Sequence, residues 1–86
     1  MSALQALAQV RGLARAGRVY FARHAVGRMA ERGASRRDVE HALRDARSCA
    51  WQEGKQTWKV SGEDLSGDAL VVAVVIDDGL LVVTVF

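Results

Sequence analysis

The run ALVVAVVI, Ala69 to Ile76, contains eight residues without a polar side chain, and five of them are β-branched. This length and composition are typical of a strand that is covered on both faces. Asp78-Gly79 follows as a tight-turn signal, and LLVVTVF, Leu80 to Phe86, then supplies a second apolar strand. The sequence therefore predicts an antiparallel hairpin whose first strand is central in a sheet.

Two more strands are expected before this hairpin. Residues Ser48 to Gln52 form an extended segment, the polar stretch Glu53 to Gln56 forms a turn, and Thr57 to Ser61 continues the sheet. In the last segment Trp58 and Val60 alternate with polar residues, as in a strand that has one apolar face. Residues 47–86 thus predict a four-stranded antiparallel sheet.

The preceding residues, 3–46, show helical spacing. Apolar side chains recur every three or four residues from Ala3 to about Ala14, and a second helix begins near His24 and ends at Gly33. Ser35, with Asp38 three residues later, predicts a capping box at the start of a third helix. A short extended piece, Val19 to Ala22, separates the first two helices. We therefore predict an α+β fold in which N-terminal helices pack on one face of the sheet.

Length and composition set further limits. The 86 residues make one domain, and a domain this small is expected to form a homodimer or to need a partner. The single cysteine, Cys49, cannot form an internal disulfide, and no Cys/His spacing resembles a zinc site. No stretch reaches the length of a membrane span. We expect a cytoplasmic chain without a metal or other cofactor and without contact to a membrane.

Charge is unevenly distributed along the chain. Residues 11–47 carry ten arginines and four acidic residues, whereas residues 48–86 carry two lysines and six acidic residues, for a net charge of +2. A basic helical half suits nucleic acid or an acidic partner protein. The alternative is that the arginines only solvate the helix surfaces, and the sequence leaves both interpretations open.

The segment HAVGRMAERG, His24 to Gly33, carries the clearest candidate site. At about 100° per residue, His24, Arg28 and Arg32 share one helix face, and Val26, Met29 and Ala30 are expected to face the core. Helix geometry by itself makes the polar face a solvated surface. Three cationic or titratable groups side by side nevertheless repel one another, and a phosphate above them would relieve that repulsion.

Other candidate residues lie in the predicted sheet. Lys59 could contact a second phosphate or face solvent, and Thr84 is the only polar side chain of the last strand. Trp51 and Trp58 flank the Glu53 turn, where they could pack in the core or stack on bases. Both alternatives stay open at this point.

The chain also resembles a known family. FARHAVGRMAERGASRRDVEHAL, Phe21 to Leu43, and WKVSGEDLSGDALVVAVVIDDGLLVVTVF, Trp58 to Phe86, are similar to the bacterial domain-of-unknown-function family 4258. Its pattern is an H-x-x-x-R-M-x-x-R-G run, a D-V-x-x-A-L helix and strands that end in T-V-[YF]. The resemblance implies a toxin of the RelE and barnase-like (MqsR-like) ribonuclease type with an antitoxin partner. It places His24, Arg28, Arg32 and Thr84 at signature positions, and Ala34 stands where many relatives have isoleucine.

These observations predict an endoribonuclease that works without a metal on RNA, including ribosome-bound mRNA. His24 would transfer a proton and Arg28 would stabilise the transition state, while Arg32, Lys59 and Thr84 would bind the substrate. No second proton-transfer residue is evident, because the nearest candidate, Glu31, could simply pair with an arginine. The alternative is therefore a binding module without enzymatic activity, whose arginine face docks nucleic acid or an acidic protein.

Overall fold

The computed structural model describes residues 1–86 and contains three helices and five strands. Along the chain these are α1 (Ala3–Arg15), β1 (Val19–Phe21), α2 (Arg23–Arg32), α3 (Arg36–Arg44), β2 (Ser48–Gln52), β3 (Thr57–Glu63), β4 (Ala69–Ile76) and β5 (Leu80–Val85). The α+β class is confirmed. β3 extends two residues beyond its predicted end, whereas β4 has the predicted bounds.

The prediction of a four-stranded antiparallel sheet is wrong, because the sheet has five strands in the order β1-β5-β4-β3-β2. β1 pairs with β5 in parallel, with Val19 opposite Leu80 and Phe21 opposite Val82. This strand comes from inside the predicted helical half, so the division at residue 46 does not separate helices from sheet. Three residues are too short to show the alternation that identifies a strand in sequence. Their partner lies at the other end of the chain.

β4 occupies the centre of the sheet, as its unbroken apolar run predicts. It pairs antiparallel with β3 on one side and with β5 on the other. Leu70, Val72 and Val74 are buried on the face that carries the core. Ala73, on the opposite face, is also only 2% exposed. Val71 and Val75 on that second face are half-buried, so β4 is fully covered on one face and partly covered on the other, and it lacks the polar alternation seen in β3.

Local signals determine where the helices begin and end. Ser35 and Asp38 form the predicted capping box of α3, and Ser2 with Gln5 forms another at α1. Gly33 ends α2 in the left-handed conformation, at φ 69°. None of the three helices is long and apolar enough to cross a membrane.

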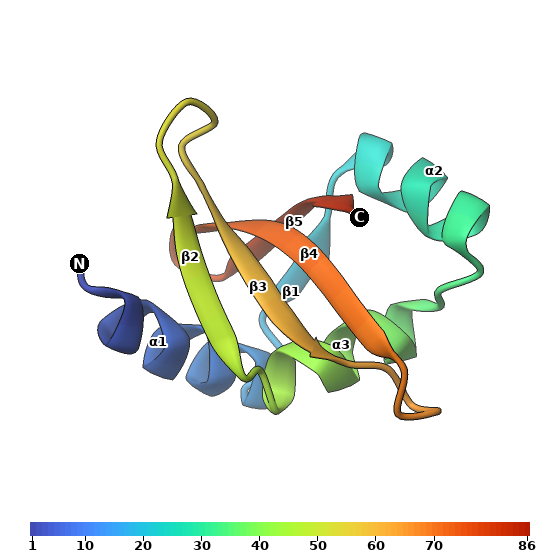
Figure 1. Cartoon of the computed structure of the whole chain (residues 1–86), viewed down its shortest axis with the longest axis horizontal. Coiled ribbons are helices and arrows are strands. Elements are labelled where there is room, and N and C mark those ends of the chain that lie inside the picture. Colours follow the sequence, from blue (N-terminus) through green and yellow to red (C-terminus); the bar gives the residue numbers. More distant parts are fainter.

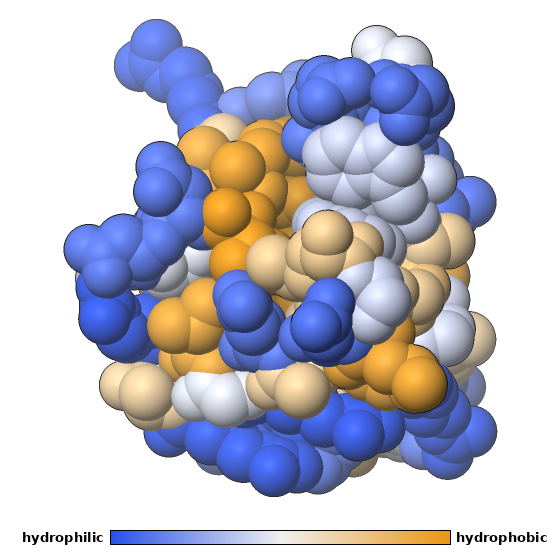
Figure 2. All heavy atoms as spheres, turned by 90° about the vertical axis from the view of Figure 1, so that its left-hand side faces the viewer, coloured by the Kyte–Doolittle hydropathy of each residue, from blue (hydrophilic) through white to orange (hydrophobic).

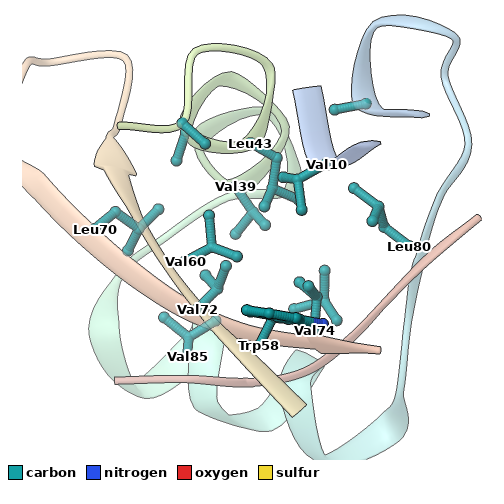
Figure 3. Packing of buried hydrophobic residues seen from close by; sticks show 14 of the residues in the cluster. Val10, Val39, Leu43, Trp58, Val60, Leu70, Val72, Val74, Leu80 and Val85 are labelled. Atoms are coloured by element: carbon teal, nitrogen blue, oxygen red, sulfur yellow. The ribbon is translucent and has the colours of Figure 1, made fainter. Parts of the chain in front are cut away.

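The core lies between the sheet and the helices α1 and α3 (Figure 1). Val10 of α1 and Val39 and Leu43 of α3 point toward the side chains of Val60 and Val72 on the strands (Figure 3). All five residues are at most 1% exposed. One face of the sheet is therefore buried in the core, and residues of α2 and the β2–β3 hairpin border the other face.

α2 takes a different position from the other two helices. It lies against β5 at the C-terminal side of the fold, apart from α1 and α3 (Figure 1). Ala25 and Met29 join the core cluster, while His24 and Arg28 reach the other side of the sheet. All three helices therefore contribute to the same core, but α2 lies against β5, so its polar flank also borders the opposite face of the sheet.

Candidate functional site

α2 presents a narrower apolar face than its sequence predicts. Met29 is buried as expected, but Val26 is 42% exposed and Ala30 is exposed as well. Ala25, one turn before Met29, is fully buried instead. The helix packs chiefly against β5, and its two buried residues lie four positions apart on the same helix face. The polar side chains on its flank are consequently free to border the sheet.

A hollow of about 510 Å³ lies on the sheet face opposite the core. Its lining residues come from α2, the β2–β3 hairpin, β4, β5 and the C-terminal residue: His24, Arg28, Gln52, Lys55, Thr57, Ala73, Val75, Val83, Thr84 and Phe86. Two cations and an imidazole thus line the hollow, and no acidic side chain does so. The volume lies within the usual range of small-molecule sites, about 300–1,000 Å³.

A β-bulge shapes the floor of this hollow. Val74 pairs with Val82 while its neighbour Ala73 pairs with Thr84, so Val83 is the extra residue on β5. Bulges bend a strand and redirect its side chains. Both Val83 and Thr84 line the hollow as a result, and Val85 returns to the core. Thr84 is half-buried there, at the position that the sequence identified as unusual.

Arg28 is held in place by two contacts. Its Nε donates to the backbone carbonyl of Val85 at 3.2 Å, and its Nη1 donates to Glu31 Oε2 at 2.8 Å. The guanidinium is part-buried, and Nη2 has no partner within the chain. Glu31 therefore pairs with Arg28, as the sequence suggested, and one nitrogen of the arginine stays available to a ligand.

His24 lies one helical turn before Arg28 and lines the same hollow. It is exposed and makes no hydrogen bond within the chain. Ala22 precedes the helix without a side-chain cap, and the first turn contains no acidic residue. An uncapped helix N-terminus leaves backbone N–H groups that favour an anion. The imidazole thus stands at the end of the helix where a phosphate is best tolerated.

The remaining predicted site residues are more dispersed. Lys59 is exposed on the same sheet face, directly opposite Ala73, with its Nζ 4.8 Å from the centre of the Phe86 ring. Arg32 is exposed at the end of α2 and does not line the hollow. The structure therefore brings together His24, Arg28 and Thr84, keeps Lys59 at the border, and leaves Arg32 outside.

Three polar lining residues were not among the predicted site residues: Gln52, Lys55 and Thr57. Thr57 was expected on an outward face but is only 7% exposed, and its hydroxyl donates to Gln52 Oε1 at 3.1 Å. The two residues are direct partners in the hairpin register. A hairpin drawn from the sequence could have paired them, but nothing in the sequence brings this hairpin near His24.

The tryptophans face away from this site. Trp51 and Trp58 are direct partners across β2 and β3, with ring centres 5.2 Å apart. With Met1 and Ile76 they line a second hollow, of about 450 Å³, whose four lining residues are all hydrophobic. Figure 2 shows the end of the molecule beside α1 and β2, where apolar atoms are exposed among hydrophilic ones. Bases bound beside His24 would therefore not stack on the tryptophans.

Comparisons with known proteins find one family. The model of the family described as "Domain of unknown function (DUF4258)" matches residues 21–86, which include α2, α3 and all strands except most of β1. No curated protein and no solved structure matches the chain. The match covers every residue that lines the hollow beside His24.

Proposed function

The chain belongs to the DUF4258 family, and we propose that it is a toxin-type endoribonuclease whose active site is the hollow between α2 and the β2–β3 hairpin. One observation carries this proposal. The hollow is lined by His24, Arg28 and Lys55 and by no acidic residue, in a chain that has ten Asp and Glu residues. Such a site attracts a polyanion and offers it a group that can transfer a proton.

The phosphate of the substrate would lie between α2 and Thr84. Arg28 offers its free Nη2 there, and the Thr84 hydroxyl offers a further hydrogen bond. Because the contacts to Val85 and Glu31 already hold the guanidinium, little reorganisation is needed when charge develops on the phosphorus-bound oxygens. Lys59 and Arg32 lie outside the hollow and would bind neighbouring phosphates of the same RNA chain.

The reaction is an internal transesterification of RNA. The 2′-oxygen attacks the adjacent phosphorus, a P–O2′ bond forms, and the P–O5′ bond breaks. His24 takes the proton from the 2′-hydroxyl or gives one to the departing 5′-oxygen, and water serves the other transfer. The products are a 2′,3′-cyclic phosphate and a 5′-hydroxyl end. The chain's exposed imidazole can exchange its proton with solvent between turnovers.

Cleavage of a labelled single-stranded RNA by purified protein tests the proposal. We expect wild-type protein to release cyclic-phosphate ends and His24→Ala to lower the rate by at least about 100-fold. Arg28→Ala should lower it by a similar factor. Arg44→Ala is the matched control, because Arg44 is an exposed arginine of α3 that does not line the hollow and forms no ion pair.

Two results would contradict the ribonuclease. One is equal cleavage by wild type and His24→Ala purified in parallel, since this would indicate a contaminating nuclease or another catalytic group. The other is cleavage of a substrate with a single 2′-deoxy residue at the cut site, because the attacking hydroxyl is then absent. An mRNA bound to ribosomes should be assayed beside free RNA, since the resemblance to RelE-like toxins implies both substrates.

A binding module without enzymatic activity is the second candidate. It is favoured by arginines of α2 and of the first turn of α3 that form no ion pair: Arg23, Arg32, Arg36 and Arg37. Such a module would bind RNA or an acidic protein with strong salt dependence and without product formation. Its binding would weaken in Arg28→Ala and stay unchanged in His24→Ala.

The proposal has four further parts. The chain has a RelE-like fold, forms a homodimer, acts in the cytoplasm and binds a protein antitoxin. They rest on the family resemblance and on the small size of the domain, not on a contact within the chain. Toxicity on expression, relieved by the product of a neighbouring gene, is the expected result for a toxin. Harmless expression of a protein that cleaves RNA in the test tube would instead favour a housekeeping ribonuclease.

A further inference from the structure

The hollow has two chemically different ends. Thr84 and Lys59 are both direct partners of Ala73, so they mark one level of the sheet, next to Arg28. Thr57 precedes Lys59 by two residues on β3, and Val75 follows Ala73 by two residues on the antiparallel β4. Both therefore lie at a second level, about 7 Å from the first at the rise of a strand. The first level carries the groups that suit a phosphate. The second level carries other groups, which the proposed reaction does not use.

The floor of the hollow between these levels is apolar. Ala73, Val75 and Val83 provide it, and the bulge on β5 adds Val83 to this surface. A flat aromatic ring can cover such a floor and remove it from water, which contributes roughly 25 cal/mol for each Å² buried. A phosphate or a ribose would not use this surface. The floor therefore fits a nucleobase.

The wall at the second level presents hydrogen-bond donors. The Thr57 hydroxyl donates to Gln52 Oε1, which fixes the Gln52 amide and leaves its Nε2 group without a partner in the chain. Lys55 lines the same end and forms no ion pair. Thr57 is nearly fully buried, so the orientation of the amide is set before any ligand arrives.

We propose that this end of the hollow binds a guanine base, through its O6 and N7 atoms, next to the scissile phosphate. The Hoogsteen edge of guanine displays two adjacent acceptors, N7 and O6, whereas adenine replaces the second of them by an amino donor. Gln52 Nε2 and the Lys55 ammonium supply two donors to meet them. The inference rests on the proposed function, since it makes the hollow a nucleotide site and names the base it selects.

Binding of the four ribonucleoside 5′-monophosphates to the intact chain tests this inference without requiring cleavage. Titrations followed by NMR or calorimetry should give a dissociation constant for GMP about 10-fold below that for AMP. Gln52→Leu keeps a side chain of similar length but removes the donors, and should reduce this ratio to within about 2-fold. Ribose 5-phosphate, which lacks a base, should bind Gln52→Leu and wild type equally. Gln9→Leu, an exposed position of α1, is the matched control and should keep the preference.

The outcomes separate this inference from the ribonuclease. A GMP preference that depends on Gln52, in a protein that cleaves no RNA, supports the base site and refutes the enzyme. RNA cleavage by a protein that binds the four nucleotides equally overturns the guanine site and leaves the enzyme standing. A GMP preference that persists in Gln52→Leu also overturns the assignment, and so does the absence of binding of any nucleotide at millimolar concentration.

Discussion

Substitution of Gly62 by alanine should disrupt the packing of α3 on β3. Gly62 is buried, and a Cβ atom built on it would lie 2.3 Å from the carbonyl oxygen of Ala42 and 3.0 Å from its carbonyl carbon and Cα. All three atoms belong to the backbone of α3, so no side chain can rotate away. The helix and the strand would have to move apart by on the order of 1 Å, because carbon atoms prefer separations of about 3.5–4.0 Å.

The expected loss of stability follows from the packing contacts that this separation weakens. Val39 and Leu43 of α3 are fully buried in the core that they share with Val60 of β3, which is 1% exposed. A radial gap of 0.5–1 Å forfeits about a quarter to a half of each contact energy. Overpacking costs about 1–3 kcal/mol in general, and a backbone clash belongs at the upper end. We expect a loss of about 3 kcal/mol, or about 12–24 °C in melting temperature for a domain of this size.

Urea unfolding followed by circular dichroism, together with a thermal melt, measures this loss. The matched control is Gly12→Ala, since Gly12 lies inside α1, is exposed and has no atom within 4 Å of a built Cβ. Alanine should stabilise that helix by about 0.5–1 kcal/mol, so the two substitutions are expected to act in opposite directions. Equal urea midpoints for Gly62→Ala and wild type would refute the close approach of β3 and α3.

The remaining predictions concern one helix cap and one thiol. Ser35→Ala removes the acceptor of the Asp38 N–H and should lower the free energy of unfolding by about 1 kcal/mol in urea titrations. Hydrogen bonds from the Ser35 and Leu65 N–H groups and the Ser35 hydroxyl hold the pKa of Asp38 below its ordinary value. The stability that the Asp38 carboxylate contributes is therefore fully present above its ordinary pKa, and it is lost as the pH falls through the lowered pKa. Between neutral pH and about pH 3 the urea midpoint of Asp38→Asn should fall less than that of wild type; an equal fall would contradict this. Burial raises the pKa of the Cys49 thiol, and Arg11 opposes this only in part, so iodoacetamide should alkylate it more slowly than free cysteine at neutral pH. Mass spectrometry follows the reaction, and a rate equal to that of free cysteine would show that the thiol is not shielded.

Elements that depend on local pattern could be predicted from the sequence. The Ser35 capping box, the left-handed Gly33 and the bounds of β4 need only neighbouring residues to determine them. The shared face of His24 and Arg28 likewise follows from helix periodicity. Predictions for α2 failed where its neighbours mattered: Val26 and Ala30 are exposed because this helix packs on one strand rather than on a broad surface.

The sequence by itself thus determined the class of fold and most helix and strand limits. It also identified His24, Arg28 and Arg32 as the polar face of α2. Only the tertiary structure decided what those residues face. The pairing of Val19 with Leu80 joins distant parts of the chain, and the bulge at Val83 turns Thr84 into the hollow. Gln52 enters the same hollow from the opposite side. Contacts between distant segments depend on the sum of many weak packing interactions, so they cannot be predicted from a local sequence pattern.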